Sequence, residues 1–462
     1  MQPEAISFPV SAAARGTVLL VACAVLALGM LLPPGAVLVG ISIAAVVFLT
    51  LVRPVVGFIA LAVAAPWLGG MEQTFGTFSL APTDLLIAGI GIAWLADAAV
   101  RRHSLIATRI WTPYVFLYLV AISLSALAGL DWHSSLKEIV KWAEMLVIYL
   151  AAVRFLRRRD VPFVLAALIA AGVSQAILGY IQFLFGLGPE AFLQHRLFLR
   201  AYGTFDQPNP YAGYLNMIIP FSLVLGALPG RGRGLSWAAF ILMVGALLAS
   251  QSRGALLAFL VASTIVCSVL WSRAAAMARL GLLALAAGGW LASFGLVPLG
   301  PFQKLINAVG LNVTFSNVTN ANFSAVERAA HWLAGVRMFS AHPLLGVGIG
   351  NFGLAYPRYH PRGWYASLEH AHNYYINVAA EAGVVGLGAY LLVAGSALWY
   401  SYRAIRLATD RFSFVAALGL LGVLVATDFH NVFDVLYVHG LVALLGLLVA
   451  LVPVSLGVRE AG

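Results

Sequence analysis

Two arginines of this chain lie at positions where a charged side chain is unexpected. Arg253 lies in the segment 250–254 between two apolar stretches, and Arg328 lies at the start of a helical pattern further along. An ionisable group beside a bilayer is costly and is a functional candidate by default. Because a guanidinium stays charged and can donate two parallel hydrogen bonds to a phosphate, we predict that both bind a phosphate-bearing ligand. The alternatives are contact of Arg253 with lipid headgroups and a solvated helix charge at Arg328.

The run His370-Ala371-His372-Asn373 stands at the entry to another apolar stretch. A histidine can accept a hydroxyl proton at neutral pH, so we predict that His372 receives a proton from an acceptor hydroxyl or orients it. Two histidines at i and i+2 do not share a helical face, which argues against a metal pair on a helix. Asn373 is expected to cap the following helix. A structural role for these histidines is the alternative.

Other polar residues are expected to bind substrate. Asn209 lies in the segment 203–211, where its amide would bind a sugar or, as the simpler interpretation, cap a helix. Pro208 and Pro210 are expected to exclude a helix from this segment and to fix a turn. Arg337 follows Arg328 by nine residues, so the two should point to nearly opposite faces of a helix, with Arg337 towards solvent or headgroups. The expected substrate-binding residues are Asn209, His370, Asn373, Tyr374 and Arg337, and no metal ligand is expected.

The composition excludes an ordinary soluble domain. Of the 462 residues, 62% are hydrophobic and only 10% are charged, whereas soluble domains carry about 25% charged residues. The net charge of +10 comes from arginines in short loops, which the positive-inside bias explains better than nucleic-acid binding. Cys23 and Cys267 lie far apart inside apolar segments, so neither a disulfide framework nor a metal site is expected.

The apolar stretches predict an all-α, polytopic bundle of about 12–14 transmembrane helices, because lipid offers no partner to open sheet edges. These stretches divide the chain into helices 1–11 within residues 1–296, a partly helical periplasmic loop over 297–372, and helices 12–14 within 373–462. The expected spans are 17–32, 35–52, 54–70, 83–100, 111–129, 138–155, 161–187, 211–229, 235–250, 254–271, 278–296, 373–400, 412–428 and 435–453.

The short loops also predict which segments share one side of the membrane. With the N-terminus inside, every arginine-rich loop falls on the cytoplasmic side. In the long loop, an amphipathic helix is expected from Ser324, which would form a capping box with Glu327, to His342. Two short connections near the N-terminus and five later segments are expected outside, and the later five hold nearly all the unusual polar residues. These five are 130–137, 188–210, 250–253, 297–372 and 429–434.

Several short motifs, in this order, resemble the bacterial O-antigen ligase superfamily, which includes O-antigen ligases, O-antigen polymerases and protein O-oligosaccharyltransferases. The motifs are Ser252-Arg253-Gly254, Arg328 early in a large loop, His342-Pro343-Leu-Leu-Gly-Val-Gly, His372-Asn373-Tyr-Tyr-Ile-Asn and Glu381-Ala-Gly-Val-Val-Gly. The resemblance implies a GT-C-like, metal-independent glycosyltransferase without a cofactor. It also implies a location in the bacterial inner membrane, with the active site facing the periplasm.

The resemblance further implies that a glycan passes from undecaprenyl pyrophosphate to an acceptor hydroxyl, and the expected reaction is O-antigen ligation to lipid A-core oligosaccharide. Arg253 and Arg328 would bind the pyrophosphate, and His372 would lie at the acceptor side. O-antigen polymerisation and transfer to a protein hydroxyl stay open. A transporter or flippase also stays open as an alternative function. Transporters usually gather charges near the membrane midplane, whereas this chain gathers them at the outer rim. The expected partners are the lipid-linked donor, the glycan or protein acceptor and membrane lipids, and not nucleic acid.

Overall fold

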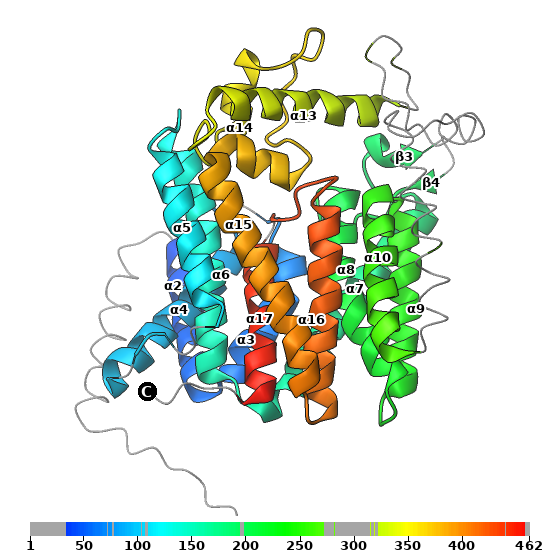
Figure 1. Ribbon diagram of the computed structural model, residues 1–462. Helices are drawn as coiled ribbons and strands as arrows, with labels where there is room; N and C mark the ends of the chain where they lie inside the picture. The colour runs from blue at the N-terminus through cyan, green and yellow to red at the C-terminus, as the bar shows by residue number, and fades with distance from the viewer. Residues whose placement is uncertain are drawn as a thin grey trace, which may run out of the picture.

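The protein is a bundle of long helices with one further helix lying across an end of it (Figure 1). The computed structural model describes residues 34–271, 281, 315, 318 and 322–457, apart from gaps at 72, 76–77, 103, 107–109, 195–197 and 439. The predicted spans 17–32 and 278–296, and most of the first part of the predicted loop, lie outside the described residues.

Helices make up most of the described residues, and the strands among them form two short antiparallel hairpins. In these, β1 (Gln73–Phe75) pairs with β2 (Phe78–Leu80), and β3 (Leu193–Gln194) pairs with β4 (Phe198–Leu199). The α-helices are α2 (Pro34–Val52), α3 (Pro54–Leu68), α4 (Pro82–Arg101), α5 (Thr112–Ala126), α6 (Trp132–Phe155), α7 (Val161–Phe185), α8 (Pro208–Ala227), α9 (Arg233–Ser250), α10 (Arg253–Leu270), α13 (Phe323–Ala341), α14 (Phe352–Ala355), α15 (Tyr374–Leu407), α16 (Arg411–His430) and α17 (Leu441–Leu456). Short 3-10 turns cover η1 (Arg158–Asp160), η2 (Glu190–Phe192) and η3 (Tyr356–Arg358).

Seven of the described helices are long and apolar enough to cross a membrane, and α3, α5 and α17 are shorter apolar helices. Each predicted span that falls within the described residues coincides with one helix, with shifts at the ends. The prediction of an all-α polytopic bundle is therefore confirmed.

Proline begins several of these helices. A proline suits the first turn because the N–H it lacks would have no acceptor within the helix there. Pro208 is the first residue of α8, and Pro210 lies in the same turn. The expectation that these two prolines exclude a helix is therefore wrong.

The centre of the bundle is formed by α8, α16 and α17. All residues from Tyr211 to Gly226 of α8 are buried, as are all residues from Leu441 to Ser455 of α17. A helix that is apolar and buried on every side is typical of a bundle centre. These helices position the two connecting segments 200–207 and 431–440, which lead into α8 and α17.

Helix α13 lies across the end of the bundle (Figure 1). Val326, Ala330, Ala334 and Met338 recur at helical spacing and are buried, so this face packs against α15. Helix α13 and residues 342–371 are here called the outer layer. The helix ends at His342 as predicted, but its start differs. Its N-cap is Asn322, and no side-chain hydrogen bond caps it, so the capping box expected from Ser324 is wrong.

Helix α15 is interrupted at Gly383, whose φ of 64° and ψ of −163° are not helical. The loop segment 343–348, here called the strap, closes against this interruption. The N–H of Val347 donates to a carbonyl in the turn before the break at 2.9 Å, and the N–H of Val384 donates to the Pro343 carbonyl at 2.8 Å. The strap therefore fixes the outer layer to the helix that follows His372.

Gly383→Ala should destabilise the protein. A Cβ at this position would lie 2.1 Å from the Leu344 carbonyl oxygen, and the positive φ disfavours any other residue. We expect a loss of about 2 kcal/mol or more, seen as a lower thermal midpoint in detergent. Gly388→Ala in the same helix is the control, because its Cβ would meet nothing within 4 Å. Equal midpoints for the two variants would contradict the strap.

Candidate active site

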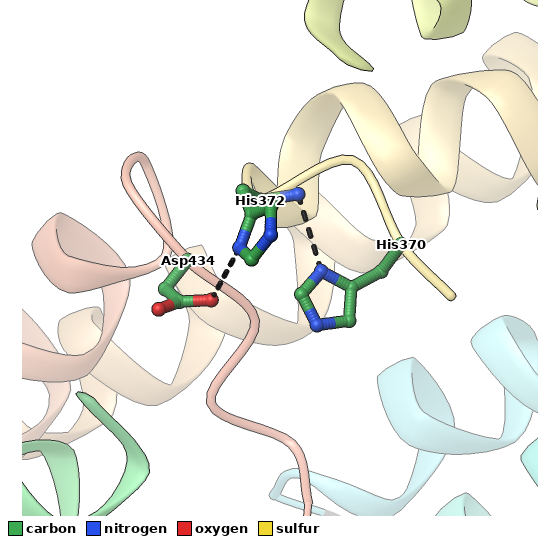
Figure 2. Close-up of side chains that lie close together, drawn as sticks. All are labelled: His370, His372 and Asp434. Carbon is green, nitrogen blue, oxygen red and sulfur yellow. Dashed lines mark hydrogen bonds and ion pairs between the residues drawn. The ribbon is translucent and has the colours of Figure 1, made fainter. Parts of the chain in front are cut away.

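His372 and Asp434 form the centre of the candidate site (Figure 2). The Nδ1 atom of His372, just before α15, lies 3.1 Å from Oδ1 of Asp434, in the connection between α16 and α17. His372 has a φ of 51°, which non-glycine residues adopt rarely, and its carbonyl accepts a hydrogen bond from Trp332 at 3.3 Å. A backbone held in this conformation by its neighbours is typical of functional sites.

The charge of Asp434 decides which nitrogen of His372 carries the proton. Burial alone would raise the pKa of Asp434, but the hydrogen bond from His372 and the nearby charges of His372 and Arg328 lower it well below its usual range. An ionised carboxylate only accepts hydrogen bonds. The Nδ1 of His372 must therefore be the donor, which leaves the Nε2 of a neutral ring as a proton acceptor.

His370 supports the backbone of His372 from the other side. Its Nδ1 accepts the N–H of His372 at 3.2 Å (Figure 2). Burial and the neighbouring His372 lower the pKa of His370, Asp434 raises it, and the net result is a pKa of about 4. His370 is therefore neutral near pH 7, and at least one of its nitrogens is used within the protein.

The low pKa of His370 predicts a loss of stability in acid. Between the ordinary pKa of about 6.5 and the folded value, the unfolded chain binds a proton that the folded chain does not, so stability falls as pH falls through this window. His370→Gln should therefore lose less of its thermal midpoint between pH 7 and pH 4.5 than the wild type, by about 2–4 °C. Parallel pH profiles of the two midpoints would contradict this prediction.

Arg253 and Arg328 meet beside the segment that carries Asp434. The Nε of Arg328, on α13, donates to the carbonyl of Phe433 at 3.2 Å. Arg253 is the first residue of α10, and its charge and that of Arg328 act on each other. A Cβ on Gly254 would lie 3.0 Å from the Cβ of Phe433, so the start of α10 packs closely on the same segment. The structure thus brings the two predicted arginines together around residues 430–434.

Asn209 joins a third arginine to Asp434. Its Nδ2 donates to Oδ2 of Asp434 at 2.7 Å, and its Oδ1 accepts a hydrogen bond from Nη2 of Arg200 at 3.2 Å. The N-cap of α8 is Gln207, whose side chain makes no capping bond. The interpretation of Asn209 as a helix cap is therefore wrong, because its amide links two charged groups instead.

The remaining predicted residues lie in different places. Asn373 caps α15 by accepting the N–H of Ile376 at 3.0 Å, which confirms its predicted capping role. Arg337 is exposed, and its Nη1 donates to the carbonyls of Tyr359 at 3.0 Å and His360 at 3.1 Å. The structure therefore places Arg337 in the surface of the outer layer, separate from the contacts that join His372, Asp434 and Asn209.

Tyr374 belongs to a buried group of rings on the bundle side of His372, here called the aromatic cluster. Its hydroxyl lies 2.9 Å from that of Tyr118, and its ring centroid lies 4.6 Å from that of Tyr437. Tyr374 thus faces other rings rather than Asp434 or the arginines. The cluster consists of Tyr118, Trp142, Tyr374, Tyr390 and Tyr437, each at most 4% exposed.

His370, His372 and Asp434 also offer ligand atoms within 4.8 Å of one another, so their spacing alone could hold a metal ion. The hydrogen bonds point elsewhere. Both carboxylate oxygens of Asp434 already accept hydrogen bonds, from His372 and from Asn209, and Nδ1 of His370 accepts a backbone N–H. The nearby charge of Arg328 also repels a cation, so these contacts argue against a metal centre at this group.

Two residues of this site, Arg200 and Asp434, were not predicted. The available signal was their location, since both lie in outer segments that the sequence marked for unusual polar residues. Their selection depends on the packing of α8 against α16, which brings together Asn209 and Asp434 across 225 residues.

Residues 238–391 match a family model described as O-antigen ligase. The matched stretch contains Arg253, Arg328 and His372, whereas Arg200 and Asp434 lie outside it. The comparison with curated proteins gave no match. The family match agrees with the resemblance of the motifs and with the polytopic helical fold. Residues 238–391, about a third of the chain, are therefore similar to the O-antigen ligase family, and this similarity supports the relation that the motifs indicated.

Proposed function

We propose that this protein transfers a glycan from undecaprenyl pyrophosphate to an acceptor hydroxyl, and that the acceptor is lipid A-core oligosaccharide. The observation that carries this proposal is the pairing of His372 with Asp434 beside Arg253 and Arg328. Glycosyl transfer from a pyrophosphate needs a group that receives the acceptor proton and positive charge at the leaving group. Both kinds of group lie around the same segment of the chain.

The reaction follows from these positions. The acceptor oxygen attacks the anomeric carbon and forms the new glycosidic bond, while its proton passes to Nε2 of His372. The bond between the anomeric carbon and the pyrophosphate oxygen breaks, and its electron pair leaves with the lipid pyrophosphate. Asp434 stabilises the resulting imidazolium through Nδ1, and the two arginines stabilise the charge that develops on the leaving oxygen. In-line displacement would invert the anomeric configuration.

The proposal includes transfer without a metal ion. Fixed guanidinium groups can bind phosphate oxygens bidentately and supply the positive charge that a cation would otherwise bring. Arg253 and Arg328 are held for this by the start of α10 and by the Phe433 carbonyl.

We also propose that the site faces the periplasm from the bacterial inner membrane. The arginine-rich connections belong to the opposite end of the helices, and the positive-inside bias places such connections in the cytoplasm. At that end, the connection between α6 and α7 is joined to the connection between α15 and α16 by an ion pair of Arg158 with Asp410. Arg154 likewise makes one with Asp97.

The test is reconstitution of the purified protein in liposomes with an undecaprenyl-pyrophosphate glycan. Lipid A-core, a second lipid-linked repeat unit and a serine-containing pilin peptide are offered separately, each with and without EDTA. We expect lipid A-core to gain the glycan, detected as a mass increase, at the same rate in EDTA. A rate that falls with EDTA and recovers with a divalent cation would overturn the metal-independent step.

The other acceptors separate the remaining activities. Elongation of the lipid-linked glycan would show a polymerase, and a glycosylated peptide would show a protein glycosyltransferase. Movement of the lipid-linked glycan across the liposome bilayer, with no transfer to any acceptor, would overturn the proposed function in favour of a flippase.

A further inference from the structure

Arg200 is held between the two halves of the site by hydrogen bonds that leave part of its guanidinium free for other contacts. It lies in the segment between β4 and α8. Its Nε donates to the carbonyl of Ser250 at 2.8 Å, and its Nη2 donates to Oδ1 of Asn209 at 3.2 Å. A guanidinium has five N–H groups, and these two bonds use two of them. The Ser250 contact places Arg200 at the end of α9, close to Arg253 at the start of α10.

Arg200 adds a third positive charge to the site. Burial and the charges of Arg328 and Arg253 lower its pKa, Asp434 raises it, and the net result is a pKa of about 10. Arg200 is therefore still a cation near pH 7. Three guanidinium groups around one carboxylate leave an excess of two positive charges. Like charges so close together destabilise one another unless an anion lies between them.

A pyrophosphate diester carries one negative charge on each phosphate and so matches this excess. A lipid monophosphate ester to a sugar carries a single charge and would leave one arginine unbalanced. The charge balance of the site therefore depends on Arg200. Without it, the excess would be one positive charge, which matches a lipid monophosphate donor and not a lipid pyrophosphate donor.

Arg200 also determines the orientation of Asn209. A guanidinium only donates hydrogen bonds, so the atom of Asn209 that faces it is the carbonyl oxygen. The amide nitrogen of Asn209 then faces Asp434 and donates to Oδ2 at 2.7 Å. A flipped amide would set an oxygen against the carboxylate and weaken the position of Asp434, which holds His372 through Oδ1.

We propose that Arg200 has two roles, both of which rest on the proposed function. It is a third guanidinium ligand of the donor pyrophosphate, and it is a positioning residue that acts on His372 through Asn209 and Asp434. The hydrogen-bonded series connects the leaving-group side of the site to the proton acceptor.

The first role is tested by binding alone. The undecaprenyl-pyrophosphate and undecaprenyl-monophosphate esters of the same sugar are titrated into the protein in nanodiscs, with no acceptor. We expect the wild type to prefer the pyrophosphate, and Arg200→Gln to bind it about 10–100-fold more weakly with little change for the monophosphate. Arg200→Lys should keep part of the preference, because it keeps the charge but loses the fork. Arg358→Gln, an exposed arginine in η3, is the control. Unchanged pyrophosphate binding by Arg200→Gln would overturn the ligand role.

The second role is tested by a double-mutant cycle on the turnover number at saturating donor. If Arg200 acts through Asn209, then Arg200→Gln should cost much less in an Asn209→Ala background than in the wild type. Additive losses would overturn the positioning role. Thermal midpoints of all variants confirm folding, and Arg200→Lys serves if Arg200→Gln does not fold.

The failure of this inference is distinct from the failure of the proposed function. A wild type that transfers no glycan to any acceptor rejects the function, even if pyrophosphate binding depends on Arg200. A wild type that transfers glycan, together with an Arg200→Gln variant that equals it in binding and turnover, rejects the inference alone.

Discussion

Arg253→Ala should lower the rate of glycan transfer by about 10²–10³-fold, and Arg328→Ala should have an effect of the same size. In the proposed reaction, each removes a guanidinium that stabilises the developing charge on the leaving pyrophosphate. Because the charges of the two arginines act on each other, we expect both to contact the same anion. The effect should appear both in the Michaelis constant for the donor and in the turnover number, because the charge is present before the reaction and grows during it. The measurement is the initial rate of transfer in liposomes over a range of donor concentrations.

The expected loss of transfer rate has two causes, the lost charge and the lost bidentate hydrogen bonds. Two further variants separate them from a general effect of removing an arginine. Arg253→Lys keeps the charge without the bidentate fork and should recover only part of the rate. Arg358→Ala removes an exposed arginine of the outer layer and should transfer normally. If Arg253→Ala and Arg328→Ala both retained wild-type rates while inserted in the membrane, the pyrophosphate role would be wrong.

His372→Ala and Asp434→Asn should each reduce the turnover number by about 10²–10⁴-fold. The first removes the proposed proton acceptor. The second replaces a group that only accepts with an amide that can also donate, so the ring is no longer held with its proton on Nδ1. Neither residue is a proposed ligand of the pyrophosphate, so the Michaelis constant for the donor should change little. The measurement is the turnover number at saturating donor across pH 5–9.

Glu190→Gln is the matched control for Asp434→Asn, because Glu190 is an exposed carboxylate in η2. It should transfer glycan at the wild-type rate. A His372→Ala variant with a normal turnover number and only a weaker affinity for the acceptor would show that His372 positions the acceptor and does not take its proton.

The helices could be predicted because the membrane imposes a local rule. A stretch must be apolar for long enough to cross the hydrocarbon core, and both properties are read from neighbouring residues. Element ends were predicted less well. Asn322 and Ser324 both have side chains that can cap a helix, and the sequence alone favoured Ser324 because of Glu327. The break at Gly383 was not predicted, since it depends on the strap 343–348 approaching the helix from the outer layer.

The site was predictable in part for a related reason. Arg253, Arg328 and His372 lie in short motifs, so a local pattern was enough to single them out. Asp434 lies 62 residues from His372, and no periodicity connects them. Asn209 was interpreted as a helix cap because rules that use only neighbouring residues cannot detect the carboxylate of Asp434, which is 225 residues away in the chain. Partners of this kind are chosen by the tertiary packing of central helices.

The aromatic cluster on the bundle side of His372 has a consequence for the membrane as an insulator. Its hydroxyls bond to one another, with Tyr118 to Tyr374 at 2.9 Å and Tyr390 to Tyr437 at 2.8 Å, and the Trp142 ring packs against them. Each ring of the cluster is at most 4% exposed, and its four tyrosine hydroxyls are paired with one another, so these hydroxyls need no water as a partner. If His372 takes a proton from the acceptor, as we propose, this packing favours return of the proton to the side from which the substrates came over passage through the rings.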